Sequence, residues 1–283
     1  MHFTKMHGIG NDFPMVNCLG KDGEDLLAEV QRRAIFLCDR KFGVGGDGVI
    51  AILPGQKAPF AMRMFNPDGS EAEMCGNGIR CFAKYIYDRG LSRGATDIPV
   101  ETGAGLLLLQ VHPGADGKAA MVRVDMGRPV LTPSEVPTTL GEGDAPVINL
   151  PLDIGDRTIY VTTVSVGNPH AITFVDDVKN FPIETVGPYV ESHPAFPRRI
   201  NTEFIEVLSD HEINFRVWER GAAETLACGT GASAATVACV LNGKTGRRVL
   251  VHLPGGDLDI EWSEADDHVY MTGPAAEVFE GEI

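Results

Sequence analysis

The sequence is poor in basic residues, with 24 Lys and Arg against 39 Asp and Glu and a formal charge of −15. It contains no basic run, so we do not expect it to bind nucleic acid or an anionic membrane. It also lacks an apolar run long enough to span a bilayer, and its first residues lack the apolar segment of a signal peptide. These absences predict a soluble, cytoplasmic protein.

The six cysteines lack the spacings of common metal sites, since the chain has no C-x-x-C pair and no His at zinc-finger spacing. We therefore interpret them as reduced thiols rather than as a disulfide framework. We expect four of them to be buried, small apolar side chains: Cys18, Cys38, Cys81 and Cys239. The sequence has no obvious site for a metal or for pyridoxal phosphate, so we predict no cofactor.

The chain does contain a short motif that occurs twice. Cys75-Gly76-Asn77-Gly78 and Cys228-Gly229-Thr230-Gly231 each precede a segment with helical character, residues 79–87 and 232–241. Each cysteine is therefore expected at a helix N-terminus, where unpaired N–H groups and the helix dipole favour negative charge. A thiol in that position should have a lowered pKa. The glycines let the backbone come close to a bound anion.

Polar residues at matched distances suggest that the chain is an internal duplication. Asn66 and Glu219 each lie nine residues before a motif cysteine, and Asn11 and Asn168 each follow a glycine some 60 residues before one. Two homologous halves would face each other, and the cysteines would meet in the cleft between them. The alternative is that C-G-x-G recurs by chance.

The order of expected elements supports an α/β fold of the α+β type. Each half repeats the same order of several strands, a helix, more strands, the C-G-x-G helix and further strands, which predicts two pseudo-symmetric halves. We place the first half at residues 1–126 and the second at 127–272, joined by a linker at Gly127-Arg128-Pro129. Residues 24–39 and 183–193 have the spacing of helices. Residues 98–111 and 120–126 are predicted as strands.

Two opposed thiols could invert the stereocentre of a carbon acid. One thiolate would remove a proton from one face while the other thiol delivers a proton to the opposite face. The two helix N-termini would stabilise the charge that develops on an α-carboxylate. Glu219-Arg220 suggests one ammonium and one carboxylate contact. The remaining candidate contacts are Asn11, Asn66, Asn168 and Asn201, with His170 either supporting the site or purely structural.

Five stretches of the sequence resemble the diaminopimelate epimerase family: residues 5–13, 66–81, 167–170, 219–231 and 253–256. The resemblance implies a cofactor-independent epimerase that interconverts LL- and meso-diaminopimelate, usually as a homodimer. It implies two α/β halves, each with mostly antiparallel strands wrapped around a central helix, and a C-terminal tail, residues 273–283, that joins the first half. It implies Cys75 and Cys228 as the acid–base pair. It also implies these substrate contacts: Asn11, Asn66, Gly76, Asn77, Asn168, Asn201, Glu219, Arg220, Gly229 and Thr230.

Two alternatives stay open at this point. A proline or hydroxyproline racemase would share the fold, although that group usually has His where Asn77 stands and lacks the Glu219-Arg220 pair. A non-catalytic thiol redox protein would also use two reactive cysteines. Turnover of a substrate that depends on Cys75 would exclude the redox protein.

Overall fold

The computed structural model describes all 283 residues, which form two compact units. Unit 1 comprises Met1–Asp125 and Thr272–Ile283, and unit 2 comprises Met126–Met271. Each unit contains a mostly antiparallel sheet and two helices, which confirms the predicted fold class.

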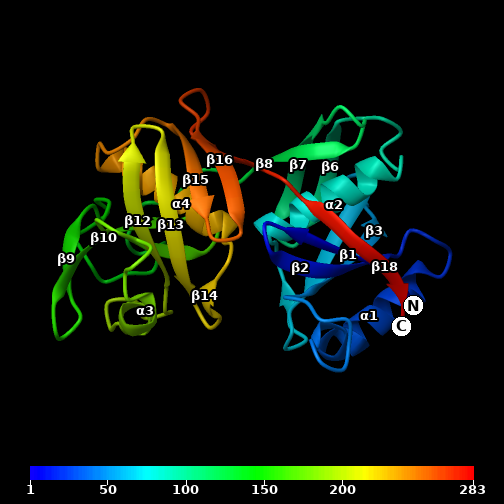
Figure 1. The fold of residues 1–283 in the computed structure, drawn as a ribbon, viewed down its shortest axis with the longest axis horizontal. Coiled ribbons are helices and arrows are strands. Elements are labelled where there is room, and N and C mark those ends of the chain that lie inside the picture. The colour runs from blue at the N-terminus through cyan, green and yellow to red at the C-terminus, as the bar shows by residue number, and fades with distance from the viewer. The chain divides into compact units, whose positions relative to one another are not determined.

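Unit 1 is built around a sheet in which β18 pairs with β1, and β1 with β2, in antiparallel fashion. Figure 1 shows β18, in red, alongside the blue β1. From β2 the pairing continues parallel to β3, antiparallel to β4, parallel to β6, and antiparallel to β7 and β8, with the short β5 on β4. The elements are β1 (His2–Gly8), β2 (Asn11–Asn17), α1 (Gly23–Cys38), β3 (Val49–Pro54), β4 (Phe60–Phe65), β5 (Glu71–Ala72), α2 (Gly76–Asp88), β6 (Asp97–Thr102), β7 (Gly105–Pro113), β8 (Ala119–Asp125) and β18 (Ala276–Glu282).

Unit 2 repeats this pattern of pairing. Strands β9, β10 and β11 are antiparallel, β11 is parallel to β12, β12 antiparallel to β13, β13 parallel to β15, and β15 antiparallel to β16, with the short β14 on β13. The elements are β9 (Leu150–Asp153), β10 (Thr158–Ser165), β11 (Pro169–Phe174), α3 (Ile183–Glu191), β12 (Asn201–Ser209), β13 (Glu212–Glu219), β14 (Ala223–Thr225), α4 (Gly229–Leu241), β15 (Arg248–Leu253), β16 (Gly256–Trp262) and β17 (Val269–Gly273).

The two ladders correspond element by element, so the predicted duplication is confirmed at the level of topology. Strands β1–β4 of unit 1 match β10–β13 of unit 2, and β6 and β7 match β15 and β16. The short β5 and β14 directly precede the matching helices α2 and α4, whose N-caps are Cys75 and Cys228. The duplicated motif therefore occupies the same place in both units.

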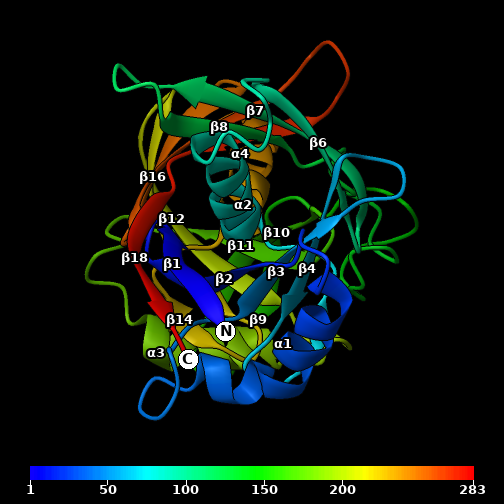
Figure 2. The same ribbon diagram turned by 90° about the vertical axis from the view of Figure 1, so that its right-hand side faces the viewer.

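Each of these two helices forms the centre of its unit. Ten of the thirteen residues of α2 are buried, and the helix packs on β1, β2, β7 and β8. Figure 2 shows α2 with β6, β7 and β8 above it and β1, β2 and β3 below it. Helix α4 is equally buried and packs on β10, β11, β12 and β16 of its own unit. Its many Ala and Gly residues allow this close approach, since larger side chains would hold the strands away.

One predicted strand is wrong, because residues 98–111 form two strands rather than one. Strand β6 ends at Thr102 and β7 begins at Gly105, with the Thr102 hydroxyl donating to the Gly105 carbonyl oxygen at 2.9 Å. Gly105 has φ of 120°, which the turn requires and a side chain would disfavour. None of the four helices is long and apolar enough to cross a membrane.

Candidate active site

Cys75 caps the N-terminus of α2. Its backbone is extended, with φ −138° and ψ 119°, and its sulfur accepts the Gly78 N–H at 3.5 Å. The thiol in turn donates to the Oδ1 atom of Asn11, 3.6 Å away. The thiol is half-buried, so these hydrogen bonds hold it in place while a ligand can still reach it.

Asn11 connects this thiol to a carboxylate. Its Oδ1 also accepts from the Nδ2 atom of Asn77 at 3.1 Å, while its own Nδ2 donates to Asp47 at 2.6 Å. The structure thus brings together three residues predicted from the sequence, Asn11, Cys75 and Asn77. Asp47 was not predicted, because nothing in its sequence context distinguishes it from a turn residue.

A small ionic network anchors the start of β2 beside Asn11. Asp12 pairs with Lys5 at 2.6 Å and with Arg40 at 2.7 Å, and Arg40 also reaches Asp47 at 2.6 Å. Burial opposes ionisation of Asp12, but the hydrogen bonds from Arg40 and Lys5 outweigh it and lower its pKa to about 2. Asp12 is therefore ionised at neutral pH and holds two strands and the Arg40 loop together.

We expect Asp12→Asn to lower the free energy of unfolding at neutral pH by about 2 kcal/mol, because the folded-state pKa lies below the ordinary value of 3.8. The stabilisation is present above the unfolded-state pKa and is lost as the pH falls towards 2. Urea unfolding of both proteins across this range measures the effect. A difference that persists undiminished at pH 2 would contradict it.

Cys228 caps α4 in the same way but lies in a more buried setting. Its sulfur accepts the Gly231 N–H at 3.4 Å and lies 3.5 Å from the Thr230 hydroxyl, and the residue is 5% exposed. The expectation of a lowered pKa is wrong for this thiol. Burial, followed by the nearby carboxyl groups of Glu219 and Glu203, raises its pKa well above the ordinary value, and the bonds from Thr230 and Gly231 offset this only in part.

We therefore expect Cys228 in the unliganded protein to react with iodoacetamide at a rate that still increases above pH 9, since only the thiolate is nucleophilic. Cys75→Ser isolates this thiol for the measurement, and peptide mass spectrometry identifies the alkylated residue. A rate that reaches its plateau below pH 9 would contradict the raised pKa.

Glu219 and Thr225 form the side of the unit 2 site next to Cys228. The Thr225 hydroxyl donates to the Glu219 carboxylate in a short contact between β14 and the end of β13. Burial raises the pKa of Glu219, while the hydrogen bond from Thr225 and the charge of His170 lower it. Glu219 is thus a half-buried acceptor held beside the cysteine.

His170 and Glu203 form a fully buried pair beneath the start of α4. The Nδ1 atom of His170 lies 2.6 Å from Glu203 Oε1, and its Nε2 atom lies 3.0 Å from Asn168 Oδ1. A Cβ atom on Gly231 would come within 2.8 Å of Glu203 Oε1 and 3.2 Å of the Cys228 sulfur. Glu203 was missed at the sequence level, although an acidic residue among the apolar residues of β12 was a signal for it.

Asn201 and Arg220 are joined through a backbone contact. The Asn201 Oδ1 atom accepts the Arg220 N–H at 2.9 Å, and its Nδ2 donates to the Pro169 carbonyl oxygen at 2.9 Å. The Arg220 guanidinium donates to the Arg198 carbonyl oxygen at 3.2 Å. Asn66 lies in the turn after β4, where its side chain donates to Ser70 at 3.0 Å and its backbone carbonyl accepts the Gly69 N–H.

The arrangement supplies acid–base groups and anion-binding groups, but no grouping of three or more His, Cys, Asp or Glu side chains suited to a metal ion. Gly76 and Gly229 are the first residues of α2 and α4, so their backbone N–H groups are among those left without an intrahelical acceptor. Because both residues are glycines, a carboxylate bound there would contact backbone N–H donors with no side chain in the way.

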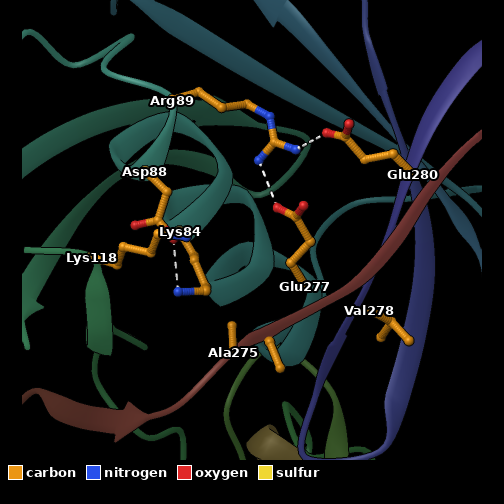
Figure 3. A pocket seen from close by; sticks show the side chains of 9 residues that line it. Lys84, Asp88, Arg89, Lys118, Ala275, Glu277, Val278 and Glu280 are labelled. Carbon is orange, nitrogen blue, oxygen red and sulfur yellow. Dashed lines mark hydrogen bonds and ion pairs between the residues drawn. The ribbon is translucent and has the colours of Figure 1, made fainter. Parts of the chain in front are cut away.

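A hollow of about 680 Å³ lies elsewhere in unit 1, between the end of α2 and β18 (Figure 3). Its charged groups neutralise each other, since Lys84 pairs with Asp88 at 2.8 Å and Arg89 pairs with Glu277 and Glu280 at 2.9 and 2.5 Å. None of the predicted site residues lines it. The hollow is therefore not the candidate active site.

Comparison with solved structures shows that the fold is that of the PhzF proteins and the proline racemases. The chain aligns over its whole length with a PhzF-family protein of Bacillus anthracis (TM-score 0.68, 17% identity, 98% of that chain). It aligns equally with a hydroxyproline epimerase of Agrobacterium vitis (TM-score 0.71, 16% identity, 90% of that chain). At these identities the likeness establishes the fold alone.

Sequence comparison places the chain within one family of this fold. The model for diaminopimelate epimerase matches residues 3–132 and 162–278. Enzymes named diaminopimelate epimerase from Agathobacter rectalis and Moorella thermoacetica are each 54% identical over 288 and 283 residues, which cover 100% of this chain and 99% of each relative. The chain belongs to the diaminopimelate epimerase family.

Proposed function

We propose that this protein is a cofactor-independent epimerase that interconverts LL- and meso-diaminopimelate, a step of lysine and peptidoglycan-precursor synthesis. The observation that carries the proposal is the duplicated cysteine cap. In each unit a buried helix begins at a cysteine whose sulfur accepts a backbone N–H, within a chain 54% identical to a named diaminopimelate epimerase over its full length.

Cys75 and Cys228 would form the acid–base pair, as the sequence predicts. One thiolate removes the α-proton, and the other thiol delivers a proton to the opposite face of the same carbon, which inverts it. Positioned acid–base groups contribute roughly 10²–10⁴-fold to such a reaction. Donors at a developing oxyanion add about 2.7–4 kcal/mol each, and the N-termini of α2 and α4 offer several.

The predicted substrate contacts stand as part of this proposal. Asn11 and Asn77 lie beside Cys75, and Thr230 and Glu219 lie beside Cys228. Gly76, Gly229, Asn66, Asn168, Asn201 and Arg220 complete the set, with His170 as a supporting residue. We also propose that the protein acts in the cytoplasm, where its six free cysteines would stay reduced, and as a homodimer. Sedimentation of the purified protein tests the dimer.

Proton NMR of LL-diaminopimelate in D₂O with enzyme and no added cofactor tests the reaction. We expect the α-proton signal to disappear while signals of the meso isomer appear. Exchange with proline or hydroxyproline instead would move the assignment to the racemases, which the 16% identity to the hydroxyproline epimerase does not favour. No exchange with any of these by fully reduced protein would favour the redox alternative.

A further inference from the structure

The two duplicated asparagines, Asn11 and Asn168, are each held by side-chain hydrogen bonds that lead to a carboxylate, but the residues involved differ between the units. In unit 1 the Asn11 amide bonds directly to Asp47. In unit 2 the Asn168 amide bonds to His170, which in turn bonds to Glu203. Neither Asp47 nor Glu203 contributes to the acid–base pair or to the predicted substrate contacts, so both are available for another role.

Asp47 determines which way the Asn11 amide faces. A carboxylate accepts hydrogen bonds only, so the atom of Asn11 that lies 2.6 Å from Asp47 Oδ2 is the donor Nδ2. Oδ1 therefore faces the Cys75 thiol and the Asn77 amide. Asn11 thus offers an acceptor at the site.

His170 gives Asn168 the opposite orientation. Both of its ring nitrogens face oxygen atoms, namely Glu203 Oε1 and Asn168 Oδ1. Since the amide oxygen can only accept, Nε2 carries a proton, and a second proton lies between Nδ1 and Glu203. Because Oδ1 of Asn168 is bound to His170, its Nδ2 is left as a donor.

Comparison of the two units shows that this buried pair replaces apolar residues. In the parallel pairing of β2 with β3, Met15 lies opposite Ile50, and in that of β11 with β12, Ile172 lies opposite Glu203. Since Met15 and Ile172 each lie four residues after the duplicated asparagine, Glu203 takes the place of Ile50. By the same count His170 takes the place of Phe13.

The surroundings of the two helices support this equivalence. A Cβ atom on Gly78 would first meet the Ile50 side chain at 2.7 Å, and one on Gly231 would first meet Glu203 at 2.8 Å. All four residues of the two pairs are fully buried. An apolar pair is therefore compatible with this fold, yet unit 2 buries an ionisable pair whose Glu203 Oε2 has no hydrogen-bond partner. Such a group costs stability, which points to a functional role.

We propose that Asp47 and the Glu203–His170 pair are positioning residues that turn the two duplicated asparagines in opposite directions, so that Asn11 offers an acceptor and Asn168 a donor. The duplication supplied the same amide twice, and different neighbours gave each copy its own polarity. The effect on substrate affinity rests on the proposed function, whereas the effect on the Cys75 thiol does not.

The first experiment compares Asp47→Ala with Arg40→Ala. Arg40→Ala removes the ion pairs of Arg40 with Asp12 and Asp47 but keeps the bond between Asp47 and Asn11. In Asp47→Ala the Asn11 amide can turn its Nδ2 donors towards the Cys75 sulfur, which favours the thiolate. Both variants keep the other charged groups near Cys75, namely Arg80 of α2, whose charge interacts with Cys75, and the pair of Lys5 with Asp12.

We expect Asp47→Ala to speed alkylation of Cys75 by iodoacetamide several-fold at neutral pH and to raise KM for diaminopimelate roughly tenfold with a smaller change in kcat, the scale of one hydrogen bond to a charged group. Arg40→Ala should leave both values within about twofold, well below that scale. Equal changes in the two variants, or an unchanged alkylation rate in Asp47→Ala, would show that Asp47 acts only through the ionic network.

The second experiment gives unit 2 the residues of unit 1, as the double variant His170→Phe, Glu203→Ile. We expect it to fold, since Phe13 and Ile50 occupy the matching places, and to raise KM roughly tenfold because Asn168 has lost its fixed orientation. Asn168→Asp should raise KM similarly in the wild-type background but add little in the double variant. An unchanged KM in the double variant, or fully additive effects, would overturn the proposal for unit 2.

Discussion

We expect Cys75→Ser and Cys228→Ser each to lower the rate of epimerisation by roughly 10³-fold or more, because each removes one of two groups whose acid–base roles contribute about 10²–10⁴-fold. Serine is the informative replacement. It is a strong N-cap residue and can still accept the Gly78 or Gly231 N–H, so the helix start is preserved while the acidic thiol is lost.

Each variant should retain half of the reaction. The remaining thiolate can still remove the α-proton that faces it and return a deuteron to the same face, without inversion. In D₂O, Cys75→Ser should therefore exchange the α-proton of one stereoisomer and Cys228→Ser that of the other. Proton NMR separates loss of signal from appearance of the second isomer. Full epimerisation by either variant would contradict the two-base mechanism.

The second large effect concerns stability and arises from Arg80, the largest fully buried side chain. Its Nη1 donates to the Gly76 carbonyl oxygen at 3.0 Å and its Nε to that of Pro274 at 3.2 Å, so it connects the first turn of α2 to the segment before β18. Burial lowers its pKa to about 10, which leaves it a cation at neutral pH.

Arg80→Met should lower the free energy of unfolding by about 3–5 kcal/mol, since two buried carbonyl groups lose a charged donor. Arg89→Met is the matched control in the residue that follows α2. Arg89 also reaches β18, through Glu277 and Glu280, but these pairs are partly exposed, so its loss should cost about 1 kcal/mol. Urea unfolding measures both. Similar losses in the two variants would show that the buried Arg80 stabilises the fold no more than the partly exposed Arg89 does.

The repeat in the sequence predicted the topology because each repeated residue lies at the start or the end of a helix or strand. The cysteines mark helix starts, and Asn66 and Glu219 mark strand ends, so their equal spacing reflects equal elements. The missed break between Thr102 and Gly105 lies within apolar residues on both sides, and only the glycines marked it. The short β5 and β14 have too few residues for any period to be recognised.

The properties that depend on the third dimension could not be derived in this way. The position of Cys228 at a helix N-terminus was predicted correctly, yet its pKa is raised, first by burial and then by the carboxyl groups of Glu219 and Glu203, which come from two other strands of the unit. Asp47 lies 36 residues from the asparagine that it orients. Such groups approach through pairing of distant strands, which a local pattern does not encode.

The pairing of β18 with β1 has a consequence for how the molecule is made. Residues 276–282 complete the unit 1 sheet by pairing with residues 2–8, which lie at the opposite end of that unit in the chain order. All of unit 2 lies between these two strands in the chain, and β18 is not part of it. Domains generally fold as units once their residues are available. Unit 1 therefore cannot form the pairing of β1 with β18 until unit 2 has been synthesised, and until then the edge of β1 that pairs with β18 stays open.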